Sequence, residues 1–200
     1  QLDILQKIRY TPSQYVDWIL NLQYSTSSDI DRLDKLNDYS EDNLKYAEYY
    51  YGPQNRFLAS LKNVLKKDNP VFTNMTTLLA FQRIDEDRYS RKFRNEQVLS
   101  QKEDVMVFSL NLDLVKIWGS KHKLHYGAEL NHNLVESDAW YEHISTGERE
   151  TAQTRYPEGG SETWSVSAYS SYKWSVSEKM VLNLGARYNY GALLSVFSNP

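Results

Sequence analysis

The segments that connect the expected strands of this chain alternate between short and long. Eight segments read as β-strands: 2–10, 16–25, 55–66, 71–84, 105–114, 121–136, 163–174 and 180–190. Tight turns occupy 11–15, 67–70, 115–120 and 175–179, whereas long loops occupy 26–54, 85–104 and 137–162. Short turns join consecutive strands in antiparallel pairs. The rhythm therefore predicts an up-and-down sheet with all its turns at one end and all its long loops at the other.

Polar and apolar residues alternate with a period of two along most of these segments. In 16–25, Trp18, Leu20 and Leu22 fall on one face, and Asn21 and Gln23 fall on the other. Segments 55–66 and 71–84 alternate less cleanly. Several segments run about 9 to 14 residues, which suits a tilted membrane-crossing strand better than the strands of about 5 to 6 residues common in soluble domains. We therefore expect an all-β, antiparallel, up-and-down transmembrane β-barrel segment of about eight strands, with short periplasmic turns and long extracellular loops.

The composition is compatible with this interpretation. The mean hydropathy is -0.66 and 24% of residues are charged, as in a soluble protein. No apolar run approaches about 18 residues, which excludes a transmembrane helix, but a β-barrel keeps a polar average because half of each strand faces water. The chain has no cysteine, so it forms no disulfide or cysteine metal site. No catalytic motif occurs, and we expect no catalytic residue, metal site or cofactor.

Aromatic residues point to two kinds of surface. The chain has 16 Tyr and 5 Trp. Four aromatic residues near predicted strand ends are expected at the membrane–water interfaces, where aromatic side chains form belts: Tyr10, Trp18, Trp164 and Trp174. The alternative is that they fill the core of a β-sandwich.

The long loops carry the candidate ligand-binding residues. Loop 26–54 is rich in tyrosine, whose flat amphipathic ring suits a porphyrin, a catecholate or a sugar. Loop 137–162 adds a histidine beside aromatic residues, and such a histidine can ligate haem iron. The candidates are Tyr39, Tyr46, Tyr49, Tyr50, Tyr51, Trp140, Tyr141 and His143. The simpler interpretation assigns them to loop packing and polar surface.

Four stretches resemble TonB-dependent outer-membrane receptors of the Bacteroidota type. They are YKWSVSEKMVLNLGARYNY at 172–190, LNLQYSTSSDID at 20–31, YAEYYYGPQNRFL at 46–58, and RIDEDRYSRKF at 83–93 leading into VFSLNLDL. The resemblance implies an outer-membrane barrel of about 22 strands plugged from within. This chain would then be one contiguous part of the wall (1–200), with the plug domain and the TonB-binding box outside it.

The same resemblance implies a function. Such a receptor is not an enzyme: it binds a scarce nutrient at its extracellular loops and releases it inward when TonB acts on the plug. Its partners are TonB, outer-membrane lipid and the nutrient. The stretch RYSRKF is similar to haem receptors of the family, so haem or another iron complex is the first expectation. A siderophore, cobalamin or a glycan remains an alternative.

Two other architectures stay open at this point. A small complete outer-membrane barrel, acting as an adhesin or an enzyme, requires the first strand to pair with the last. A soluble carbohydrate-binding β-sandwich requires 106–114 and 182–190 to pack in one core under a second sheet.

Overall fold

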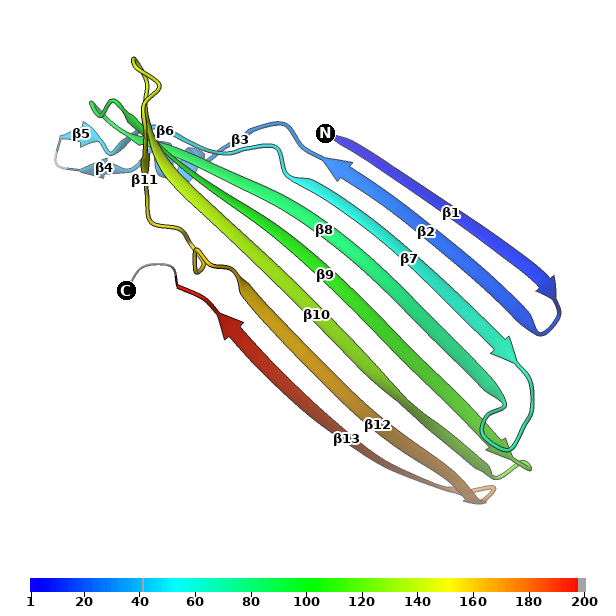
Figure 1. The fold of residues 1–200 in the computed structure, drawn as a ribbon. Helices are drawn as coiled ribbons and strands as arrows, with labels where there is room; N and C mark the ends of the chain where they lie inside the picture. The colour runs from blue at the N-terminus through cyan, green and yellow to red at the C-terminus, as the bar shows by residue number, and fades with distance from the viewer. Residues whose placement is uncertain (41, 198–200) are drawn as a thin grey trace.

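The computed structural model describes residues 1–40 and 42–197, and eight long strands form one curved antiparallel sheet (Figure 1). Each strand pairs with its neighbours along the chain, in the order β1-β2-β7-β8-β9-β10-β12-β13. Their bounds are β1 Leu2–Ser13, β2 Val16–Thr26, β7 Asn55–Lys66, β8 Asn74–Lys92, β9 Gln97–Trp118, β10 His122–His143, β12 Ser161–Ser177 and β13 Met180–Ser195. The predicted antiparallel up-and-down sheet is confirmed.

The connections gather at two ends of the sheet, which we call the turn end and the loop end. Short connections join β1 to β2, β7 to β8, β9 to β10 and β12 to β13 at the turn end, at the lower right of Figure 1. The longer excursions between β2 and β7 and between β10 and β12 lie at the loop end. This arrangement follows from the alternation of connection lengths.

One predicted loop is wrong. Most of 85–104 is strand, because β8 continues to Lys92 and β9 begins at Gln97, which leaves only 93–96 as the connection. The residues in this stretch are charged and therefore resemble a solvated loop, but they pair across the strands. Lys102 Nζ lies 3.1 Å from Asp87 Oδ2, and Asp87 and Lys102 face each other in register. β10 likewise continues to His143, beyond its predicted end.

Short elements occupy the rest of the loop end. Between β2 and β7 lie β3 Ile30–Asp31, α1 Leu33–Leu36, β4 Tyr39–Ser40, β5 Asn43–Leu44 and β6 Tyr46–Tyr51. β6 pairs with the protruding part of β8, whereas β4 and β5 form a separate two-stranded sheet. β11, Arg149–Thr151, pairs with the end of β10. The predicted loop 26–54 is therefore partly ordered as strands.

The register gives the sheet two unlike faces. Directly opposed residues of neighbouring antiparallel strands point to the same face. One row across β2, β7, β8, β9 and β10 is entirely leucine: Leu20, Leu61, Leu79, Leu110 and Leu130. The next row is mostly polar and points the other way: Asn21, Ser60, Ala80, Ser109 and Asn131. We call these the apolar face and the polar face.

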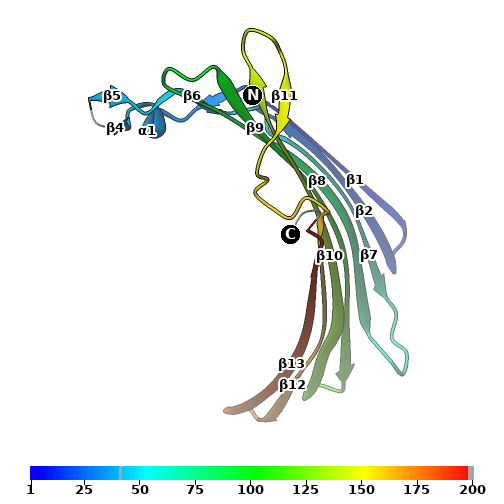
Figure 2. The ribbon, with the colours of Figure 1, turned by 60° about the vertical axis from the view of Figure 1, so that its left-hand side comes forward.

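The sheet is a single layer without a packed core (Figure 2). Among the described residues, only Ala139 and Ala152 are buried hydrophobic residues. Large apolar side chains remain open, with Leu79 49% and Phe108 43% exposed. Segments 106–114 and 182–190 lie in β9 and β13 of this one sheet, so the sandwich alternative is wrong.

The sheet is also open at both edges. In the part of the chain that the structure describes, β1 pairs with β2 alone and β13 pairs with β12 alone. The closed eight-stranded barrel, which requires β1 to pair with β13, is therefore wrong. None of the described helices has the length and apolar character needed to cross a membrane.

Candidate functional site

The tyrosine run of loop 26–54 is held at the loop end by the pairing of β6 with β8. Tyr51 faces Arg88, Tyr50 faces Tyr89 and Tyr49 faces Ser90 in the register. Because side chains alternate along a strand, Tyr49 and Tyr51 extend the polar face, and Tyr50 points to the other side. Tyr50 stacks there on Tyr89, with ring centroids 4.9 Å apart. The five predicted tyrosines therefore do not form one surface.

Two arginines organise the tyrosines on the polar face. The Arg32 backbone N–H donates to the Tyr49 carbonyl at 2.9 Å, and its guanidinium donates to the Tyr51 hydroxyl. Arg88 donates to the same hydroxyl at 3.4 Å. The guanidinium carbons of Arg32 and Arg88 lie 5.1 and 4.9 Å from the Tyr51 ring centroid, within cation–π range. Tyr46 meets Tyr49 edge to face at 5.0 Å. We call these five residues the Tyr–Arg cluster.

Sequence reasoning missed both arginines of the cluster. Arg88 was assigned to a solvated loop, and Arg32 was not considered a binding residue. Arg88 opens the stretch RYSRKF, but that resemblance singles out no residue in it as a contact, and Arg32 has no local motif that marks it. Their role arises because β6 pairs with a strand almost 40 residues further along the chain, and that pairing is visible only in the fold.

Charge in this region is largely paired. Asp34 accepts hydrogen bonds from Arg32 Nε and Nη2 at 2.7 and 2.6 Å. These hydrogen bonds, and then the positive charge of Arg32, lower the pKa of Asp34 to about 2 and raise the pKa of Arg32 above its ordinary value. Burial, followed by the negative charges of Asp29 and Glu48, raises the pKa of Tyr50. Arg32 is therefore closely paired with Asp34, whereas Arg88 lies at a longer distance, 3.9 Å, from Glu86 Oε1, and the Tyr–Arg cluster is an ordered aromatic surface with two guanidinium groups.

The remaining tyrosine of the predicted set lies apart. Tyr39 is in β4, in the separate two-stranded sheet with β5, and is 69% exposed. Nothing in the register brings it to the Tyr–Arg cluster.

The second predicted set is divided between the two faces. Tyr141 and His143 alternate with Trp140 along β10, so Trp140 points away from them. The Trp140 ring packs against Arg149, whose guanidinium carbon lies 4.8 Å from the ring centroid. Tyr141 shares the row of Tyr49, three strands away, or about 14 Å. Tyr46, Tyr49, Tyr51, Tyr141 and His143 thus share the polar face.

Both ring nitrogens of His143 have partners. Nε2 lies 2.9 Å from Glu96 Oε2, and Nδ1 accepts the Ser145 backbone N–H at 3.3 Å. Binding of an iron by His143 would therefore require one of these contacts to open. Over residues 1–40 and 42–197, no three His, Asp or Glu side chains gather as a metal-binding group.

The four predicted interface aromatics lie on the apolar face. Tyr10 and Trp18 face each other near the turn end, and Trp174 lies at the turn end of β12. Trp164 lies ten residues from Trp174, where its ring stacks on His132 at 3.8 Å. Ten residues of strand span about 33 Å, or about 23 Å along the membrane normal at a tilt of about 45°. This spacing is close to the height of about 25 Å of the apolar band of a barrel.

Comparison with known proteins gives a match in fold alone. No family model matches the chain, and no curated protein matches it. Among solved structures, the copper transporter OprC matches 96% of the chain with a TM-score of 0.71 and 13% identity. The ferric citrate transporter FecA, in its unliganded form, matches 96% of the chain with a TM-score of 0.62 and 15% identity.

The chain is much shorter than these two transporters. It covers 28% of the OprC chain and 29% of the FecA chain, so it spans less than a third of each. The predicted fold class, an antiparallel β-barrel segment like those of outer-membrane transporters, is confirmed.

Proposed function

We propose that this chain is part of the wall of a TonB-dependent outer-membrane transporter of the Bacteroidota type. The observation that carries the proposal is the single-layer sheet, whose apolar face is open and whose polar face has ordered charges. A soluble domain of this length would bury its leucine row, whereas a barrel wall exposes it to lipid. The likeness in fold to two transporters supports the same conclusion.

In this proposal the polar face lines the barrel lumen, the loop end is extracellular and the turn end is periplasmic. The plug domain and the TonB-binding box lie outside residues 1–200 of this chain, and TonB drives uptake. The barrel performs no covalent chemistry and is not an enzyme. It supplies a rigid wall and a recognition surface.

The proposed nutrient is haem or another iron complex, bound where the Tyr–Arg cluster, Tyr141 and His143 share the lumen face. The tyrosine rings offer flat contact area, and the guanidinium group of Arg88, which is less closely paired than that of Arg32, complements a carboxylate such as a haem propionate. Siderophores, cobalamin and glycans are the competing ligands. The neighbouring transporters carry copper and ferric citrate, which is compatible with a metal complex as cargo.

The test is growth of the producing bacterium under iron limitation. Deletion of the gene should abolish growth on haemin, and the full-length protein should restore it. Tyr49→Ala with Tyr51→Ala should reduce haemin-dependent growth at least tenfold. Tyr50→Ala, on the opposite face, is the matched control and should leave growth unchanged. Equal growth of the deletion strain and the parent on haemin would reject haem as the nutrient.

A further inference from the structure

The turn half of the polar face carries lysines that lack acidic partners. Lys7 shares the row of Asn21, Lys62 faces Ile19, and Lys123 faces Lys173. Because side chains alternate between the two faces along each strand, the register places all four lysines on the same face as Asp17. Within residues 1–40 and 42–197, no carboxylate oxygen lies within 4.0 Å of any of these four ammonium groups. We call these four residues the lysine set.

The carboxylates on this half of the face are already paired. Asp17 Oδ1 accepts from Arg9 at 2.9 Å and Thr11 at 2.6 Å, with Lys66 Nζ at 3.9 Å from Asp17 Oδ2. Glu129 pairs with Arg187, and Asp113 accepts from the Tyr169 hydroxyl. The cations of this half are Lys7, Arg9, Lys62, Lys66, Lys123, Lys173 and Arg187, against the carboxylates Asp17, Asp113 and Glu129. The surface is therefore strongly positive.

The excess of positive charge is most concentrated at Lys123 and Lys173. The two lysines are direct cross-strand partners of β10 and β12. Like charges placed directly opposite each other destabilise a sheet. The opposite arrangement occurs on the apolar face, where the buried Lys116 is neutralised by Asp68 at 2.6 Å. A counter-charge from outside this chain would relieve the repulsion between Lys123 and Lys173.

The size of the surface decides what kind of partner fits it. Lys7 on β1 and Lys173 on β12 are six strand intervals apart, which is about 29 Å. The lysine set extends over eight residues along the strands, or about 26 Å. The product, about 750 Å², matches the area of about 800 Å² that one partner contributes to a protein interface. A small-molecule pocket of about 300–1,000 Å³ is about 7–10 Å across and reaches only one or two of these lysines.

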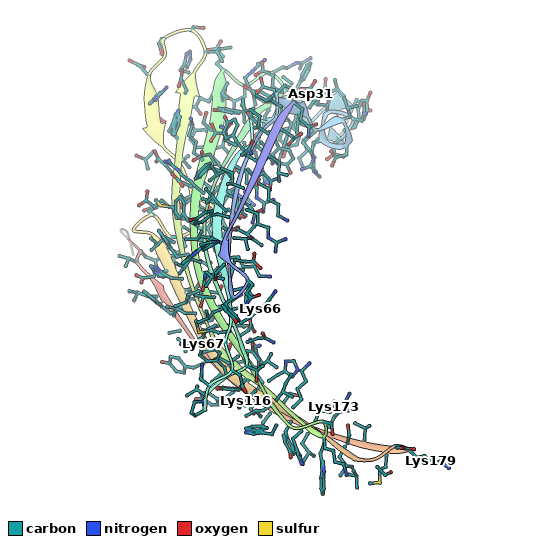
Figure 3. All side chains as sticks on the ribbon, turned by 90° about the vertical axis from the view of Figure 1, so that its right-hand side faces the viewer. Asp31, Lys66, Lys67, Lys116, Lys173 and Lys179 are labelled. Atoms are coloured by element: carbon teal, nitrogen blue, oxygen red, sulfur yellow. The ribbon has the colours of Figure 1, made fainter. Side chains whose placement is uncertain are left out.

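We propose that the lysine set docks an acidic surface of the folded domain that fills the barrel. The sheet curves around this side: Figure 3 shows Lys66 and Lys173 pointing from the sheet into the concave space. The inference rests on the proposed function, which implies a domain inside the lumen. It adds that the surface of this domain facing the wall is negatively charged, and it says which part of the wall that surface contacts. The charge complementarity seats the domain at the turn half of the wall, away from the Tyr–Arg cluster.

The experiment measures ion conductance of the full-length transporter in planar lipid bilayers. A seated domain blocks the lumen, so the wild-type protein conducts little. Lys123→Glu with Lys173→Glu should unseat the domain and raise the conductance at least tenfold. Lys67→Glu with Lys179→Glu is the matched control. It makes the same change in charge in the turns, off the polar face, and should leave conductance at the wild-type level.

A second double variant, which removes the two charges without reversing them, distinguishes loss of docking from misfolding. Lys123→Met with Lys173→Met keeps the side-chain length and removes the repulsion, so this barrel should fold and conduct at least threefold more than wild type. Wild-type conductance in both double variants would overturn the proposal, as would a full-length protein without a lumen domain. Haemin-dependent growth is a separate measurement, so failure of haem as the nutrient would leave this result interpretable.

Discussion

At the scale of single residues, Gly127 shows how the polar face is assembled. Gly127 lies between Asp113 and Tyr169 in the register, and the Tyr169 ring crosses it to donate to Asp113. A Cβ at position 127 would clash most closely with the Leu112 carbonyl oxygen, and it would lie 2.6 Å from the Tyr169 hydroxyl and 2.8 Å from the ring carbon that bears it.

We expect Gly127→Ala to displace both Tyr169 and the β9 backbone at Leu112, and to lower the free energy of unfolding by about 3 kcal/mol, the upper end of the usual cost of overpacking. Urea unfolding in detergent micelles measures this change. Gly185→Ala is the control, because the nearest atom to its new Cβ is 3.5 Å away; its effect should stay within about 0.5 kcal/mol. Equal losses for the two variants would contradict the close approach of Leu112 and Tyr169 to Gly127.

Asp34 gives a prediction of pH dependence at the loop end. Its pKa falls from 3.8 to about 2 because Arg32 donates two hydrogen bonds to it. A depressed pKa means that the pair stabilises the fold above pH 3.8 and that this stabilisation is lost as the pH falls through about 2. An NMR titration of the Asp34 carboxyl should show a midpoint near 2, and Arg32→Gln should return it toward 3.8. A native midpoint near 3.8 would contradict the pairing.

At the scale of elements, β9 separates the two faces most clearly. Leu110 belongs to the leucine row of the apolar face, and Asn111 points to the polar face. We expect Leu110→Arg to destabilise the barrel in lipid by about 2–4 kcal/mol, the cost of a cation facing the bilayer midplane. Asn111→Arg, one residue further, should cost less than about 1 kcal/mol. Comparable costs in urea-dependent unfolding from vesicles would show that the apolar face does not contact lipid.

The strands show what can be read from local sequence and what cannot. Segment 55–66 was predicted with the observed ends of β7, although its alternation is not clean, because turn residues bound it on both sides. The protruding halves of β8 and β9 were missed, since their many charged residues are typical of a loop and show no regular alternation with apolar residues. Only the strand pairing shows which residues face each other, such as Asp87 and Lys102. The two arginines of the Tyr–Arg cluster were missed for a related reason: their place beside the predicted tyrosines depends on the long-range pairing of β6 with β8.

At the scale of the whole molecule, the open edges and the bare apolar face belong together. Over residues 1–40 and 42–197, β1 and β13 each pair on one side only and no second layer covers the apolar face. The proposed barrel accounts for both features, because its further strands pair with the edges and lipid covers the apolar face. The direction of each strand and the side of each connection could be predicted from connection lengths alone. The size of the complete barrel and its nutrient could not, because the chain spans less than a third of the similar transporters.

The most direct test of this account is a nitroxide scan of residues 106–114 in β9, one label at a time, in the full-length transporter in lipid vesicles. The chain has no cysteine of its own, so each introduced cysteine in it carries a single label. We expect labels at even positions, on the apolar face, to collide with dissolved oxygen, which concentrates in the hydrocarbon core. Labels at odd positions, on the polar face, should collide with oxygen less often than labels at even positions. Uniform exposure along the strand, or even positions that collide with a water-soluble nickel chelate, would contradict a lipid-facing wall.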